Sequence, residues 1–137
     1  MSPPKEQEIA IPPRPVLGAV LAAAALCTVA AAAGARWTPD PAAAALPMPL
    51  GAAAAGLATA LSAALFTSAT PRPASVCGSL WLGATLARFV VVPGVCLLVY
   101  WSAPSAGMTP VLAVVGTYLA CLAAETATVV RIVHRSL

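Results

Sequence analysis

Charged side chains are scarce in this sequence. Only seven of its 137 residues are lysine or arginine and four are aspartate or glutamate, together 8% of the chain. A water-soluble domain of this length covers much of its surface with charged side chains, so the composition excludes an ordinary soluble fold. Hydrophobic residues make up 61% of the chain, and lipid is expected to cover part of the protein in place of water. The sequence therefore predicts an integral membrane protein.

Residues suited to catalysis, metal binding or nucleic-acid binding are also sparse. The single histidine, His134, lies near the C-terminus, and the four cysteines form no CxxC pair, so no metal site is expected. There is no glycine-rich phosphate loop, no nucleophile elbow and no pair of carboxylates at a spacing suited to catalysis, and we expect neither enzyme activity nor a cofactor. A net charge of +3 without a basic stripe argues against nucleic-acid binding. The cysteines are interpreted as small packing residues: Cys27, Cys77, Cys96 and Cys121.

Proline, glycine and the few charges divide the chain into four apolar segments of bilayer-spanning length. We expect an all-α membrane domain over residues 15–137, with four transmembrane helices in two antiparallel hairpins. The expected spans cover residues 15–34, 46–70, 79–101 and 111–130. Residues 1–14 are polar and contain four prolines, which predicts a disordered cytoplasmic head.

The first apolar segment has a second interpretation. It follows Lys5 and Arg14 and ends in small residues, as the apolar region of a secretory signal peptide does. Its apolar run is longer than the usual ~7 to 15 residues of such a region, which favours a retained span. Cleavage would leave three spans and change nothing else.

Small residues are expected to hold the alanine-rich spans together, because alanine itself is nearly neutral for membrane insertion. Ala52, Gly56 and Ala60 recur at intervals of four residues, a spacing that lets helix backbones approach closely. Gly51, Gly56 and Gly83 are the predicted packing glycines. The alternative is that an alanine-rich composition produces such pairs by chance.

Basic residues in the short connections predict the orientation, because lysine and arginine stay on the cytoplasmic side of a membrane. The head, the second connector and the tail hold five of them: Lys5, Arg14, Arg72, Arg131 and Arg135. The first loop holds only Arg36 and the third holds none. Both termini are therefore expected in the cytoplasm. Four aromatic residues near span ends suit the headgroup region: Trp37, Trp81, Tyr100 and Trp101.

Two ionisable residues, Arg88 and Glu125, fall inside predicted spans. Each costs about 2.5 to 3.5 kcal/mol at the centre of an inserted helix, so we expect them to compensate each other as an intramembrane charge pair. Arg88 would lie about 13 Å from the cytoplasmic start of its span and Glu125 about 9 Å from Arg131. On antiparallel helices their side chains would also lean toward each other.

Residues at helical spacing support a common inward face for the two charges. Thr117, Cys121 and Thr128 share the side of Glu125, and Trp81 and Thr85 share the side of Arg88. Two other interpretations remain: the pair pins two helices without further function, or Arg88 reaches the headgroups without a partner.

Pro93 lies five residues after Arg88 and is expected to bend the third span. A proline has no backbone N–H, so the carbonyl of Phe89 would lack its usual helical donor. That carbonyl would then be open to a hydroxyl, a neighbouring helix or water.

The layout resembles ATP synthase protein I, a small membrane subunit encoded beside bacterial F-type ATP synthases. The third span opens "LGATLARFVVV", with Gly83 before Arg88 and a run of aliphatic residues after it. Ala84 stands where that family often has an acidic residue, and Glu125 is a candidate replacement from the neighbouring helix. The second span "PLGAAAAGLATALSAALF" and the basic connector holding Arg72 also match.

This resemblance implies an accessory protein of the bacterial inner membrane that helps the rotor ring subunits of the synthase assemble, with linked magnesium or calcium uptake. Two other classes remain open. The first is an independent ion transporter or channel, in which Glu125 binds a proton or cation and a homo-oligomer encloses the path. The second is a structural, holin-like membrane protein.

Overall fold

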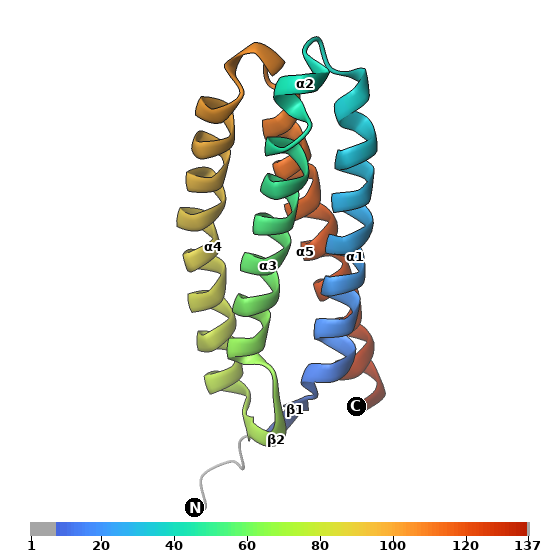
Figure 1. Ribbon diagram of the computed structural model, residues 1–137. Helices are drawn as coiled ribbons and strands as arrows, with labels where there is room; N and C mark the ends of the chain where they lie inside the picture. Colours follow the sequence, from blue (N-terminus) through green and yellow to red (C-terminus); the bar gives the residue numbers. More distant parts are fainter. Residues whose placement is uncertain (1–7, 137) are drawn as a thin grey trace, which may run out of the picture.

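The computed structural model describes residues 8–136, and most of them are helical. Four long helices form the body of the molecule (Figure 1): α1 (Pro13–Gly34), α3 (Pro47–Phe66), α4 (Ala74–Ser102) and α5 (Thr109–Ser136). All four are long and apolar enough to cross a membrane, which confirms that part of the prediction. Strand β1 (Glu8–Ile11) precedes α1, and the short elements between the long helices are α2 (Pro41–Ala44), two 3-10 turns and strand β2 (Ser68–Pro73).

The second connection differs from the prediction. Helix α3 ends at Phe66 instead of Thr70, and α4 begins at Ala74, five residues before the expected start at Ser79. The residues preceding Pro71 and Pro73 are pushed toward extended backbone, so this segment forms β2 instead of extending α3. Helix α5 also runs to Ser136, beyond the expected end at Val130.

The expectation of a disordered head was wrong for residues 8–14, while residues 1–7 lie outside the described part of the chain. Strand β1 pairs antiparallel with β2, with Ile9 opposite Arg72 and an irregularity before Ile11. Ile11 is buried in a cluster with Val16 of α1 and Phe66 of α3. An apolar anchor and a pairing strand therefore order a segment that its prolines alone suggested would be loose.

The long helices pack as a bundle in which successive helices run in opposite directions (Figure 1). Helix α1 packs against α3 and α5, and α3 also contacts α4. The β1–β2 pair and the C-terminal end of α5 lie at the same end of the bundle, and α2 lies at the other end (Figure 1).

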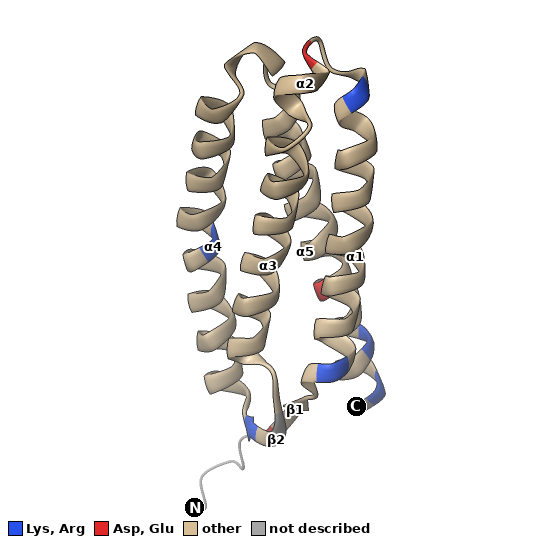
Figure 2. Ribbon diagram, viewed as in Figure 1, with Lys and Arg blue, Asp and Glu red and all other residues tan. Residues whose placement is uncertain are grey.

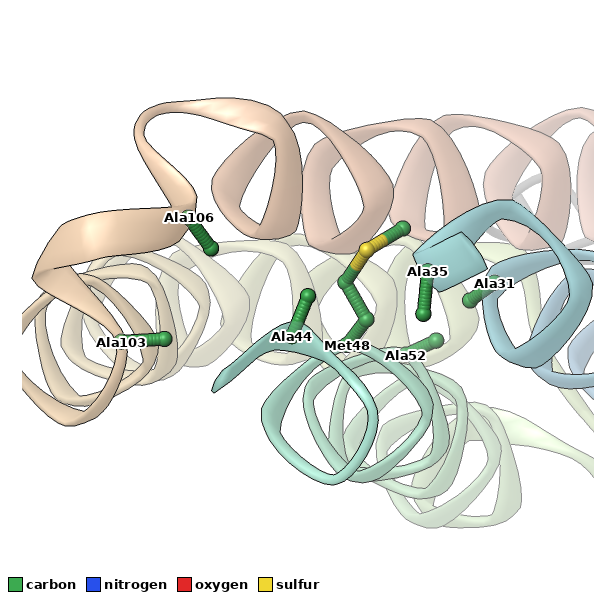
Figure 3. Close-up of a cluster of buried hydrophobic side chains, with 7 residues drawn as sticks. All are labelled: Ala31, Ala35, Ala44, Met48, Ala52, Ala103 and Ala106. Carbon is green, nitrogen blue, oxygen red and sulfur yellow. The ribbon is translucent and has the colours of Figure 1, made fainter. Parts of the chain in front are cut away.

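Small side chains fill the centre of the bundle. In the most apolar 18-residue stretch of Pro41–Phe66, which contains α3, half of the residues are buried. In the corresponding stretch of each other long helix, about a fifth are buried. Near α2, a buried cluster around a single methionine joins the α1–α3 connection to the α4–α5 connection (Figure 3): Ala31, Ala35, Ala44, Met48, Ala52, Ala103 and Ala106. Alanines at these positions let the backbones approach closely, and Met48 fills the remaining space.

Two of the three predicted packing glycines lie at close helix contacts. A Cβ atom at Gly56 would collide with the Cβ of Ala24, and one at Gly51 would fall 2.7 Å from methyl carbons of Val99 and Val114. Gly83 is different, because it is exposed and a Cβ there would meet nothing within 4 Å. The expected packing role of Gly83 is therefore wrong within this chain, because α4 turns that face away from the bundle.

Large apolar side chains cover the outside of the bundle along its length. Leu26 of α1, Leu61 of α3, Phe89 of α4 and Leu112 of α5 are each at least 65% exposed. Such a surface is far more apolar than that of a monomer adapted to water.

Candidate functional site

Arg88 and Glu125 meet inside the bundle. Helix α4 supplies the arginine and α5 the glutamate, and the two residues are 2% and 1% exposed. Arg88 Nη1 donates a hydrogen bond to Glu125 Oε1 over 3.1 Å, and Nη2 lies 2.8 Å from Oε2. The second contact is close but lacks hydrogen-bond alignment, so we treat it as an ion contact. The two charges predicted to pair are thus in direct contact.

A third helix takes part through Ser62, which the sequence did not indicate. Arg88 Nε donates to Ser62 Oγ on α3. Ser62 Oγ in turn donates to the Thr59 carbonyl over 2.9 Å, and Thr59 Oγ1 donates to the Ala55 carbonyl over 2.9 Å. Thr59 and Ser62 are three residues apart on a buried face of an otherwise alanine-rich helix. That spacing was the available signal for a polar contribution from α3.

Apolar layers surround the ion pair along the bundle axis. Toward β1 and β2, Ala84 and Phe66 belong to one buried cluster. Away from them, Val92 and Ala55 belong to another. On the side of α1, Val20 packs in a third cluster with Cys121. Removing one member of such a pair leaves a buried charge without compensation, which costs about 3 to 5 kcal/mol.

The helix faces that the sequence predicted to share the side of Arg88 and of Glu125 point only partly into the bundle. Thr117 and Cys121 of α5 are buried, and the Cys121 thiol donates to the Val20 carbonyl of α1 over 3.8 Å. Thr128 is half-buried. On α4, Trp81 is 43% exposed.

Pro93 lies within α4, which continues past it to Ser102. The side chain of Pro93 is exposed, while Val92 beside it is buried. A bend at Pro93 stays a prediction.

A second polar link lies at the α2 end of the bundle. Asp40 caps α2 by accepting a hydrogen bond from the Ala43 N–H over 3.1 Å, and it also accepts one from Ser105 Oγ over 2.8 Å. The hydroxyl of Ser105, together with the Ala43 N–H, lowers the pKa of Asp40 below its ordinary value of 3.8. This carboxylate therefore joins the connection after α1 to the one after α4.

The cysteines and the histidine do not come together as a metal-binding group within residues 8–136. The four cysteines are free thiols, and no group of three potential metal ligands occurs there. His134 is exposed near the end of α5.

A groove of about 360 Å³ runs between α3 and α4. Leu61, Leu65 and Val91 contribute apolar walls, and Ser62 and Arg88 also line it. The polar network therefore comes close to the outer surface of the bundle at one place.

The contacts between Arg88 and Glu125 favour an ion pair that joins α4 to α5 over a cation-binding site. Both carboxylate oxygens of Glu125 face the Arg88 guanidinium. A metal cation at Glu125 would have to displace a positively charged partner, and no other carboxylate in the described chain lies inside the bundle to assist it. A hydrogen bond between a guanidinium and a carboxylate is also among the stronger ones in proteins, because both partners are charged. Comparison with protein-family models, with curated proteins and with solved structures gives no significant match for this chain.

Proposed function

We propose that this chain is a multi-pass protein of the bacterial inner membrane, with four spans in two antiparallel hairpins. The four long helices support this placement, as do their exposed leucines and valines. Arg14 and Arg36, near the two ends of the first span, are separated by about 33 Å of helix, close to the ~30 Å thickness of a bilayer core. Apart from the buried pair, the charges of the described chain lie near the two ends of the bundle (Figure 2).

Both termini lie on the cytoplasmic side in this proposal. Four arginines gather at the end where α1 begins and α5 ends (Figure 2): Arg14, Arg72, Arg131 and Arg135. The opposite end carries Arg36 together with the acidic Asp40. The end richer in basic residues is the one retained in the cytoplasm.

The proposed role is that of a non-catalytic accessory protein that helps assemble the rotor ring of the F-type ATP synthase. The observation that carries it is the buried link of Arg88, Glu125 and Ser62, which ties α3, α4 and α5 into one body. A rigid body with an apolar exterior suits a scaffold for other membrane helices. The resemblance to ATP synthase protein I around Gly83 and Arg88 supplies the specific partner.

The test is the yield of intact rotor rings in cells that lack the gene. We expect fewer rings, with recovery when the wild-type gene is restored and weak recovery with Glu125→Ala. The tagged wild-type protein should also copurify with ring subunits from native membranes. Normal ring yield in the deletion strain under all growth conditions would contradict the assembly role.

An ion transporter is the second candidate, because the groove between α3 and α4 approaches a buried ionisable pair. In that case, purified protein in vesicles should move protons or cations, and Glu125→Gln should abolish the flux. The assembly role by itself requires no flux, and the magnesium or calcium uptake that the resemblance implies would be an additional activity.

A further inference from the structure

The bundle end that holds β1 and β2 carries an excess of positive charge. Arg14 lies in the first turn of α1, Arg72 on β2, and Arg131 and Arg135 near the end of α5 (Figure 2). Within residues 8–136, Glu8 is the only acidic residue at this end. The net charge at this end is therefore positive even if His134 is neutral.

Arg131 and Arg135 form the core of this cluster. They are four residues apart on α5, and both are exposed. Residues at this spacing are neighbours on one helix face, and like charges there repel each other. Helix α1 packs along α5, so exposed Arg14 adds a third positive charge at the same end (Figure 2).

The described chain supplies no anion to these three arginines. The one salt bridge between residues 8 and 136 is the buried pair of Arg88 and Glu125. The repulsion between Arg131 and Arg135 would be relieved by an anion from outside the chain. Arginine suits phosphate in particular, because its planar N–H fork can hold two phosphate oxygens at once.

We propose that Arg131 and Arg135, with Arg14, bind the phosphate of an anionic phospholipid headgroup. The site rests on the proposed membrane placement but not on the proposed role in ring assembly. That placement puts the three arginines just beyond the apolar band of the helices, at the level of the headgroups. Clusters of arginine next to a membrane span are attracted to anionic lipid headgroups at the membrane surface.

The experiment uses the full-length protein purified in a neutral detergent. Its thermal midpoint is measured while phosphatidylglycerol, phosphatidylcholine or inorganic phosphate is added. We expect phosphatidylglycerol to raise the midpoint, while the net-neutral phosphatidylcholine and inorganic phosphate leave it nearly unchanged. The double variant Arg131→Gln/Arg135→Gln should need at least about tenfold more phosphatidylglycerol for half of the effect.

Arg36→Gln is the matched control, because it removes one exposed arginine from the opposite end of the bundle. It should keep the wild-type response to phosphatidylglycerol. The double variant should keep the wild-type midpoint without lipid, since both side chains are exposed.

Three results would overturn the site. These are equal stabilisation by phosphatidylcholine, a wild-type response in the double variant, or the same stabilisation by inorganic phosphate alone. The first and third need only the wild-type protein. Release of the protein from membranes by alkaline extraction would instead contradict the membrane placement, so the two failures are distinguishable.

Discussion

At the scale of residues, the buried pair of Arg88 and Glu125 makes each member depend on the other. Taking an ion out of water costs several kcal/mol, and attraction between the partners offsets this only with good geometry. Here a hydrogen bond of 3.1 Å and an ion contact of 2.8 Å join the two side chains, and Ser62 accepts a hydrogen bond from the Arg88 Nε–H. Loss of either partner leaves the other buried and charged.

Arg88→Ala and Glu125→Ala should each lower the free energy of unfolding by about 3 to 5 kcal/mol. The double variant should lose less than the sum, because it leaves no uncompensated charge. Membrane abundance and the thermal midpoint in detergent measure this. Arg131→Ala, which changes an exposed arginine, serves as the control and should change stability little. Additive losses from the two single variants would argue against pairing.

Gly56 and Gly83 offer a matched comparison, because the first lies at a close helix contact and the second does not. Gly56→Ala should destabilise the bundle by about 1 to 3 kcal/mol, the usual cost of overpacking, because the added methyl meets Ala24. Gly83→Ala adds the same methyl where nothing lies within 4 Å. It should stabilise α4 slightly, since alanine favours helix over glycine. The test is to compare the thermal midpoint of each variant with that of wild type. Equal destabilisation by the two substitutions would contradict the close packing described for Gly56.

At the scale of elements, the segments outside the long helices are held by contacts of their own. Strand β1 pairs with β2 across the bundle end where both described chain ends lie. At the other end, Asp40 caps α2 and holds the turn containing Ser105. Each link joins two segments that are far apart in sequence, and so restrains how the long helices pack.

The Asp40 link should depend on pH. Its pKa is lower in the folded protein than its ordinary value of 3.8. The carboxylate therefore adds stability above pH 3.8, and this stability is lost as the pH falls through the lowered folded value. Asp40→Asn should have a lower thermal midpoint than wild type near neutral pH, and the difference should shrink in acid. A constant difference at all pH values would contradict this assignment.

At the scale of the whole molecule, α3 is the central element. It contacts each of the other three long helices and is the most buried of them. All four long helices expose large apolar side chains outward. The hydrophobic effect cannot drive helices together within lipid, so close packing of small residues and interhelical hydrogen bonds must do so.

The orientation can be tested on the intact protein. A reporter that is active only in the cytoplasm should be active at both the N- and the C-terminus, and inactive when inserted after Pro39 in the first loop. We expect this pattern because the arginine excess lies at the end of the bundle where α1 begins and α5 ends, and the more basic end is retained in the cytoplasm. Activity after Pro39 with silence at the termini would reverse the proposed topology.

The sequence was enough to predict the long helices and the pairing of Arg88 with Glu125, but not the strands or the part played by Ser62. It predicted four long apolar helices, because hydropathy over about 20 residues is a local property. It matched Arg88 to Glu125 from depth, since helical rise converts sequence position into height. It missed β1, because the pairing of Ile9 with Arg72 is a contact between segments far apart in the chain.

Composition and periodicity alone determined that the chain forms long apolar helices and that its two internal charges lie at a similar height. Only the tertiary structure decided which faces meet. The rotation of each helix about its axis brings Ser62 to the Arg88 guanidinium, presses Gly56 against Ala24 and leaves Gly83 outside. Height along a helix follows from counting residues, whereas rotation is set by the packing of all the helices at once.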